Sequence, residues 1–302
     1  IFFFTMKRKY LLSNGILGII LMFACQLCFA INDSIVKLSV VEIDNNISTL
    51  NVIFIRGLFS TFFIFFYLKV IQKKNTFEIL KKKSFHIRGL FEVMTALFFF
   101  TGLILMPVSN VYTLLMTNPF FVTIFAFIFL KEKVGFRRWS AVIIGFIGVV
   151  IVINPQNMQF GYLFILPIIA AIFLTIRDIA TKGIVTENNS FEIIFVTSVL
   201  MTLFSGIGSI FLDFKITFLQ IPKIFISSIF LSIAYLFSVM TIFYAPLSLT
   251  ASARYSVIIF GMIFGYLLLG EVPSYNMIIG AIIISLSGLF VIKRQKELGK
   301  IK

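Results

Sequence analysis

Residues 107–132 read PVSNVYTLLMTNPFFVTIFAFIFLKE, and residues 246–271 read PLSLTASARYSVIIFGMIFGYLLLGE. Both stretches begin with Pro-x-Ser, end with Leu-x-Glu, and align without a gap at an offset of 139 residues. Each is mostly apolar and long enough to cross a bilayer as a helix, which takes roughly 20 residues. The chain therefore contains an internal repeat whose unit includes a membrane-spanning helix.

The same repeat extends towards the start of the chain. At an offset of 145 residues, Asp33 aligns with Asp178 and Lys37 with Lys182. The change of offset falls in a Lys-rich connection between the second and third apolar segments. Ten apolar segments can be delimited in all, over residues 15–40, 48–71, 86–106, 109–130, 136–153, 161–181, 191–212, 224–244, 249–270 and 275–292.

These segments predict an all-α integral membrane protein with ten transmembrane helices in two inverted five-helix repeats. Copies with an odd number of helices must cross the membrane in opposite directions, and inverted repeats are typical of secondary transporters with a site between the halves. We expect a cytoplasmic tail over 1–14, a first repeat over 15–153 and a short outer linker over 154–160. A second repeat then covers 161–292, and a basic cytoplasmic tail covers 293–302.

Composition and charge agree with a membrane protein. Of the 302 residues, 60% are hydrophobic and 13% charged, and the mean hydropathy is +1.07, whereas soluble domains carry about 25% charged residues. With the N-terminus in the cytoplasm, twenty of the 26 Lys and Arg residues lie on the cytoplasmic side, two in outer loops and four within spans. Basic residues favour the cytoplasmic side, so both termini are predicted there, in a bacterial inner membrane. The net charge of +14 then does not indicate nucleic-acid binding.

Several function classes lack the residues they require. There is no G-x-x-x-x-G-K-[ST] motif of a P-loop ATPase, and His86 is the one histidine. An integral membrane lipid-modifying enzyme, the competing class, would need a catalytic cluster, but the acidic residues are scattered over several segments. A channel would need rings of like charge or aligned carbonyls, and the mixed charges of these spans do not supply such a ring. Cys25-x-x-Cys28 lacks the further ligands of a tetrahedral metal site. No cofactor or metal is implied.

A series of short strings marks the ends and bends of the segments. They are Pro107-Val-Ser109, Asn118-Pro119, Leu130-Lys-Glu132, Arg138-Trp139-Ser-Ala, Gly145-Phe-Ile-Gly148 and Leu268-Leu-Gly-Glu271. In this order they resemble the EamA branch of the drug/metabolite transporter superfamily, over residues 15–292. The resemblance implies a secondary carrier of a small-molecule substrate. Its cavity would be lined mainly by helices 1, 3, 4, 6, 8 and 9, with helices 5 and 10 peripheral.

Charged residues within the spans are candidates for the working site, because a charge at the bilayer centre costs about 2.5–3.5 kcal/mol and needs a cavity or a partner. Asp33 and Lys37 are four apart and can pair on one helix face, and Asp178 and Lys182 can do the same. We interpret the two pairs as outer and inner gates. The alternative is that each pair merely neutralises its own charges at a helix end.

Four further charges have open interpretations. Arg254 lies about five residues into its helix, roughly 7 Å along the axis, so it could snorkel to the surface or bind a substrate carboxylate or phosphate. Arg56 has the same ambiguity, and Arg177 could complete the charge balance of Asp178. Glu92 is either a carboxylate for proton coupling or the partner of a basic residue.

Polar and aromatic side chains on the fourth, eighth and ninth segments complete the candidate substrate site. Pro119 should kink the fourth segment, since it lacks a backbone donor. Freed carbonyls and polar groups beside a cavity can contact substrate, although helix packing explains such residues equally well. Aromatic rings there could stack on a cationic or purine group. The candidates are Asn118, Tyr112, Tyr235, Ser252 and Tyr255.

The substrate is expected to be an amino-acid-like or other polar metabolite. Asn32-Asp33-x-x-x-Lys37, His86-Ile-Arg-Gly89 and Ala253-Arg254-Tyr255 resemble family members that import S-adenosylmethionine in exchange for its spent form. That import is the alternative prediction. The expected partners are the bilayer and the substrate, with a proton or an exchanged metabolite as the coupling species. The sequence does not specify the direction of transport or the oligomeric state.

Overall fold

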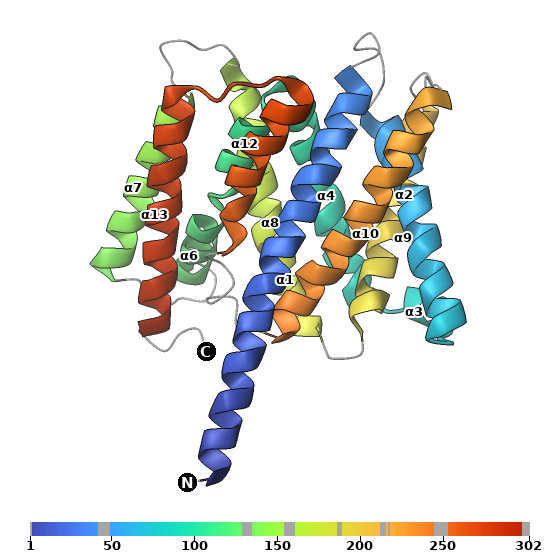
Figure 1. Ribbon diagram of the computed structural model, residues 1–302, viewed down its shortest axis with the longest axis horizontal. Helices are drawn as coiled ribbons and strands as arrows, with labels where there is room; N and C mark the ends of the chain where they lie inside the picture. The colour runs from blue at the N-terminus through green and yellow to red at the C-terminus, as the bar shows by residue number, and fades with distance from the viewer. Residues whose placement is uncertain are drawn as a thin grey trace.

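The computed structural model of the chain describes residues 2–41, 49–128, 135–153, 161–185, 189–211, 216, 218–244 and 253–297. Helices make up nearly all of these residues, and no β-strand occurs among them. The helices lie side by side in one bundle, and the start of α1 (Phe2–Val41) and the end of α13 (Tyr275–Glu297) lie at the same end of it (Figure 1).

Within the described residues, six helices are long and apolar enough to cross a membrane. They are α1, α2 (Thr49–Phe66) with the π-helical η1 (Tyr67–Ile71), α4 (Lys83–Leu105), α8 (Ile165–Ile184) with the preceding η3 (Gly161–Phe164), α9 (Ser190–Ile210) and α10 (Ile221–Tyr244). Three helices have shorter apolar stretches: α7 (Phe136–Ile153), α12 (Ser256–Leu269) and α13. The remaining pieces are α3 (Thr76–Leu80), α5 (Val108–Leu115), α6 (Asn118–Ile128) and η4 (Phe218–Gln220).

The apolar segments of the sequence are the helices of the structure. Each of the ten expected segments contains helix in its described residues. Helix α1 already begins at Phe2, so residues 2–14 are helical, and the expected cytoplasmic tail over 1–14 stays a prediction. Exposed faces carry large apolar side chains such as Phe62, Ile147 and Leu286, whereas charged side chains near the middle of the helices, such as Arg56 and Glu92, are buried, as a membrane interior requires.

The predicted kink at Pro119 is confirmed as a break between two half-helices. Met116 and Thr117 separate α5 from α6, directly before the residue pair Asn118-Pro119. Proline removes a backbone donor and disfavours a continuous helix. The hydroxyl of Thr117 donates to the carbonyl oxygen of Leu114 at 2.7 Å, so this carbonyl keeps a partner where the helix ends.

The ninth segment is interrupted at the equivalent place. Tyr255 forms a turn between the helical residues Ala253 and Arg254 and the start of α12 at Ser256. Tyr255 aligns with Met116 at the same offset of 139 residues. The two half-helix breaks therefore occupy matching positions in the repeat.

Helices from the two halves of the chain interleave. Helix α1 packs on α10, α4 on α8, α2 on α9 and α7 on α13. Figure 1 shows α7 and α13 at one edge of the bundle and α2 and α9 at the opposite edge. Helix α12 packs on α1 and on α5. The middle of the bundle is therefore enclosed by helices from both halves.

Glycine permits the close contact of α7 with α13. A Cβ atom added at Gly280 would lie 2.3 Å from Cγ2 of Val152 and 2.8 Å from the carbonyl oxygen of Gly148. Small residues let the backbones of membrane helices approach closely. Any larger residue at position 280 must push these two helices apart.

We expect Gly280→Ala to lower the free energy of unfolding by about 1–3 kcal/mol, the usual cost of overpacking. Reversible unfolding in mixed micelles, followed by the fluorescence of Trp139, measures the change. The matched control is Gly183→Ala in α8, where an added Cβ meets nothing within 4 Å. Equal stability of the two variants would contradict the close contact.

Candidate functional site

A cavity lies in the middle of the bundle. Its walls come from α1, α2, α4, α5, α8, α10 and the residues around the start of α12. The empty space around its lining atoms, including the part that is open to the outside, is about 730 Å³. The six helices that the family resemblance assigned to the cavity do line it, and α2 adds Arg56. Its described lining includes no residue of α7 or α13.

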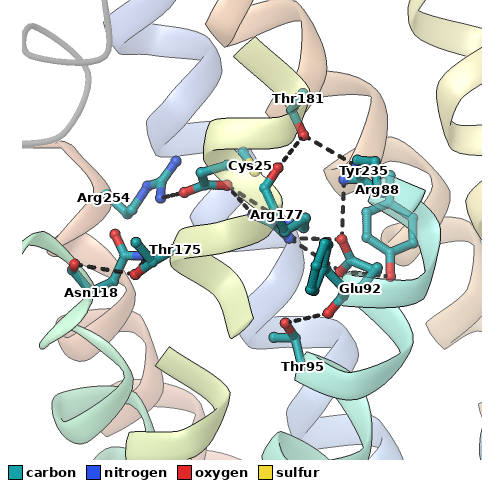
Figure 2. Close-up of polar contacts among 12 residues, drawn as sticks. Cys25, Arg88, Glu92, Thr95, Asn118, Thr175, Arg177, Thr181, Tyr235 and Arg254 are labelled. Atoms are coloured by element: carbon teal, nitrogen blue, oxygen red, sulfur yellow. Dashed lines mark hydrogen bonds and ion pairs between the residues drawn. The ribbon is translucent and has the colours of Figure 1, made fainter. Parts of the chain in front are cut away.

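The carboxylate of Glu92, on α4, is bonded to two arginines and a tyrosine. Arg88 Nη2 lies 3.0 Å from its Oε2 and Arg177 Nη1 lies 2.9 Å from the same oxygen. The hydroxyl of Tyr235 donates to Oε1 at 3.3 Å. Figure 2 shows these three side chains around Glu92: Arg88 comes from the same helix, Arg177 from α8 and Tyr235 from α10. Glu92 is therefore the partner of basic residues, the second of its two interpretations.

The carboxylate of Asp178, on α8, extends this set of contacts. Arg177 Nη2 lies 2.7 Å from its Oδ1, and Arg254 Nη1 donates to its Oδ2. The result is a continuous series, Arg88–Glu92–Arg177–Asp178–Arg254, which we call the central ion chain. All five side chains are buried. Buried ions are tolerated when they are paired and hydrogen-bonded, so this chain fixes α4 and α8 and the residues before α12 relative to one another.

A second polar group faces the cavity from α1 and α2. Asp33 Oδ2 accepts from the hydroxyl of Tyr112 at 2.6 Å, and its Oδ1 accepts from Asn32 Nδ2 at 2.6 Å. Arg56 Nη1 donates to Asn32 Oδ1 at 3.4 Å, and its Cζ lies 4.4 Å from the centroid of the Phe100 ring. Asn32 thus lies between a carboxylate and a guanidinium that do not contact each other.

The predicted pairing of Asp33 with Lys37 is wrong. Lys37 Nζ lies 2.5 Å from Glu271 Oε1 and 2.5 Å from the carbonyl oxygen of Met106. Glu271 Oε2 also accepts from the backbone N–H of Val108 at 2.7 Å, at the start of α5. Spacing of four residues brings two side chains to one helix face, but here partners on other elements are used instead.

Two predicted site residues are turned away from the cavity. Asn118 Nδ2 donates to the hydroxyl of Thr175 at 2.9 Å, which packs α6 on α8 (Figure 2). The Tyr255 ring lies so close to Gly288 that a Cβ added there would overlap its hydroxyl. Neither Asn118 nor Tyr255 lines the cavity, so both serve helix packing.

Arg254 does not snorkel to the membrane surface. Its residue surface is 9% exposed, and its guanidinium lines the cavity and binds Asp178. The other predicted neighbours, Ser252 and the side chain of Lys182, lie outside the described residues. The predicted Asp178–Lys182 pair therefore stays a prediction, while Asp178 has Arg177 and Arg254 as partners.

Sequence reasoning missed the role of Arg88, which it counted among the cytoplasmic basic residues. Arg88 is 2% exposed, and besides Glu92 it binds the hydroxyls of Thr181 at 3.2 Å and Thr197 at 2.6 Å. The spacing Arg88-x-x-x-Glu92 was the available signal, since it places both charges on one helix face.

No described group of three or more His, Cys, Asp or Glu side chains is arranged to hold a metal ion. Cys25 Sγ lies 3.3 Å from the carbonyl oxygen of Ala234 on α10, to which it donates. Cys28 is a free, half-buried thiol. The contact of Cys25 belongs to the packing of α1 on α10.

Residues 16–154 match the model of the EamA-like transporter family. Nearly half of the chain therefore resembles the EamA-like transporter family. An S-adenosylmethionine uptake transporter of Rickettsia bellii is 25% identical over 243 residues, which cover 78% of this chain and 84% of that protein. A riboflavin transporter of Rhizobium johnstonii is 26% identical over 201 residues, or 64% and 65% of the two chains.

A solved crystal structure shares the fold of this chain. It matches 95% of this chain and 98% of its own chain with a TM-score of 0.55 at 13% identity, a likeness of fold alone. Together with the apolar helices, the family and the relatives make the protein a secondary metabolite transporter and a multi-pass protein of the inner membrane.

In this transporter, Asp178→Asn should lower the free energy of unfolding by about 3 kcal/mol, because removing one partner leaves the buried Arg254 charge uncompensated. Adding Arg254→Met should restore part of that loss. Unfolding of the two single variants and the double variant in micelles gives the coupling. Strictly additive effects would contradict a direct Asp178–Arg254 interaction.

Proposed function

We propose that the transporter has ten spans in two inverted five-helix repeats, 15–153 and 161–292, with both ends in the cytoplasm. Its helix contacts support this arrangement. When each helix of a contacting pair is replaced by its counterpart in the other repeat, the result is again a pair of helices in contact. The contact of α1 with α10 becomes that of α8 with α4, and α1 with α12 becomes α8 with α5 and α6. The contact of α4 with α9 becomes that of α10 with α2, while α2–α9 and α7–α13 exchange with themselves.

The orientation has two supports. Lys and Arg are concentrated in the tails and connections that this topology places in the cytoplasm, as the positive-inside rule requires. The start of α1 and the end of α13 also lie at the same end of the bundle (Figure 1), as an even number of spans demands.

The proposed substrate is a zwitterionic metabolite that also carries an aromatic base, and S-adenosylmethionine is the specific candidate. The observation that carries this proposal is the lining of the cavity, which combines both signs of charge with aromatic rings. Carboxylates and guanidiniums suit an amino-acid head group, and aromatic faces suit a sulfonium and a purine. The lining includes Asp33, Glu92, Arg56, Arg177, Phe99 and Tyr235.

The charges of the cavity favour this substrate over riboflavin, the cargo in the name of the second relative. Riboflavin has neither an ammonium nor a carboxylate group, so it would give no counter-ion to buried charges. Burying a charge without a counter-ion is costly, and a site that binds a neutral ring system would not need buried charges.

The test is uptake of labelled S-adenosylmethionine by bacterial cells that express the transporter, with membrane insertion confirmed. We expect saturable accumulation that unlabelled S-adenosylmethionine inhibits and riboflavin does not. Faster uptake into cells preloaded with S-adenosylhomocysteine would identify exchange as the coupling. Inhibition by riboflavin, or no accumulation by inserted protein, would contradict the proposed substrate.

The Lys37–Glu271 pair is proposed to close the outer end of the cavity. It joins α1 to the end of α4, through Met106, and to the start of α5, through Val108. In the proposed topology α1 runs outward, so Lys37 lies near the outer surface. Opening the cavity to the outside then requires these bonds to separate, as alternating access demands.

We expect Glu271→Gln to reduce the rate of uptake at least about tenfold, because loss of one partner of a buried pair shifts the balance between open and closed states by more than 1.4 kcal/mol. Initial rates at matched expression measure this. The control is Glu192→Gln. Glu192 is buried as well, but its partners Lys74 and Lys82 are 31% and 46% exposed, so water can replace the lost carboxylate and the expected effect is smaller. Equal rates for the two variants would contradict a gating role for Glu271.

A further inference from the structure

We propose that Asp33, Asn32 and Arg56 form a subsite for the α-amino-acid head group of the substrate. The substrate carboxylate binds the Arg56 guanidinium, and the substrate ammonium binds the Asp33 carboxylate. This inference rests on the proposed function, because it assigns the charged end of the transported molecule to named atoms of the same cavity. It does not depend on what the rest of that molecule is.

In the part of the chain that the structure describes, Arg56 differs from the other buried arginines in having no carboxylate partner. Arg88, Arg177 and Arg254 each contact Glu92 or Asp178. Among the described residues, Arg56 forms no ion pair, although it is 1% exposed and lies in the middle of α2. A guanidinium buried at that depth needs a counter-charge.

The donors of Arg56 are largely unused. A guanidinium has five N–H donors, but the structure gives Arg56 one hydrogen bond, to Asn32 Oδ1 at 3.4 Å, and its Nε has no partner. Asn32 Oδ1 is also the acceptor of a much shorter bond, from the Ser227 hydroxyl at 2.7 Å. Because Arg56 lines the cavity, a ligand carboxylate can accept from the remaining donors.

Asp33 differs from Glu92 and Asp178 in the same way, because its partners in the described structure are neutral groups. Glu92 and Asp178 each contact two arginines, whereas Asp33 accepts from two neutral groups, the Tyr112 hydroxyl and the Asn32 amide. An ionised carboxylate has about four lone-pair sites, so two remain for a ligand ammonium. Asp33 also lines the cavity.

The separation of these two charges by one side chain points to an amino-acid head group. In such a ligand the ammonium and the carboxylate are bonded to the same carbon atom, so they present opposite charges a short distance apart. Asn32 bonds to both Asp33 and Arg56 and holds them side by side without an ion pair between them. Arg254, the earlier candidate for the carboxylate, is already bonded to Asp178.

The experiment compares two ligands that differ by the carboxylate alone, S-adenosylmethionine and its decarboxylated form. Binding to the purified transporter in detergent is measured by calorimetry. We expect the wild-type protein to prefer S-adenosylmethionine by at least about tenfold, as a charge-assisted hydrogen bond allows. Arg56→Met should remove that preference by weakening S-adenosylmethionine binding, with little change for the decarboxylated form.

Asp33→Asn supplies the reciprocal test with an analogue that lacks the amino group. The wild-type preference for S-adenosylmethionine over this analogue should fall about tenfold in the variant. The matched control for both variants is Arg137→Met, at an exposed position near the start of α7, which should keep both preferences.

Stability of the ligand-free protein separates binding from folding. Arg56→Met should be as stable as the wild type or more so, because it removes a buried charge that has no carboxylate partner. Arg56→Lys keeps the charge and loses the bidentate geometry, so it should show an intermediate preference and serves if the methionine variant does not fold.

The outcomes distinguish the subsite from the proposed substrate. An Arg56-dependent affinity for other α-amino acids, without affinity for S-adenosylmethionine, keeps the subsite and overturns the substrate. An equal loss of affinity for both ligands in Arg56→Met overturns the subsite. Failure of every α-amino acid to bind, with or without binding of riboflavin, overturns the subsite as well.

Discussion

Burial of charge within membrane-spanning helices is the constraint on which the interior of this transporter depends. Three arginines and two acids of the central ion chain satisfy one another across α4, α8 and the residues before α12. Removing Glu92 or Asp178 would leave Arg88 or Arg254 without a carboxylate partner, at a cost of several kcal/mol. The central ion chain therefore fixes the walls of the cavity. Arg56 and Asp33 lie outside it, so they are the charges that a ligand can neutralise.

The interrupted helices place this chemistry at the centre of the bundle. The break between α5 and α6 and the turn at Tyr255 lie at repeat-related positions, and residues beside both breaks, Leu115 and Arg254, line the cavity. Irregular backbone at membrane depth is tolerated where it is covered by protein or faces a cavity. At the other end of α5, the backbone N–H of Val108 donates to Glu271, which links this helix end to the Lys37 ammonium.

The amino-acid sequence was sufficient for the helices and for the kink at Pro119, because apolar length and missing backbone donors are local properties. It was insufficient for the partners of the charges. The spacing of Asp33 and Lys37 shows which face they share, but whether Glu271 or Tyr112 arrives at that face depends on how distant helices pack. Arg88 was missed because it follows a run of lysines, so its place in the sequence resembles a cytoplasmic loop.

Counterflow in proteoliposomes tests most directly the claim that a central cavity carries a zwitterion. Purified transporter is reconstituted into vesicles loaded with unlabelled S-adenosylmethionine, and labelled S-adenosylmethionine is added outside at low concentration without ATP or an ion gradient. The structure predicts a transient internal overshoot of label, absent from vesicles loaded with riboflavin or buffer. Entry of label at the same rate whatever the vesicles contain, or no entry through correctly inserted protein, would contradict the claim.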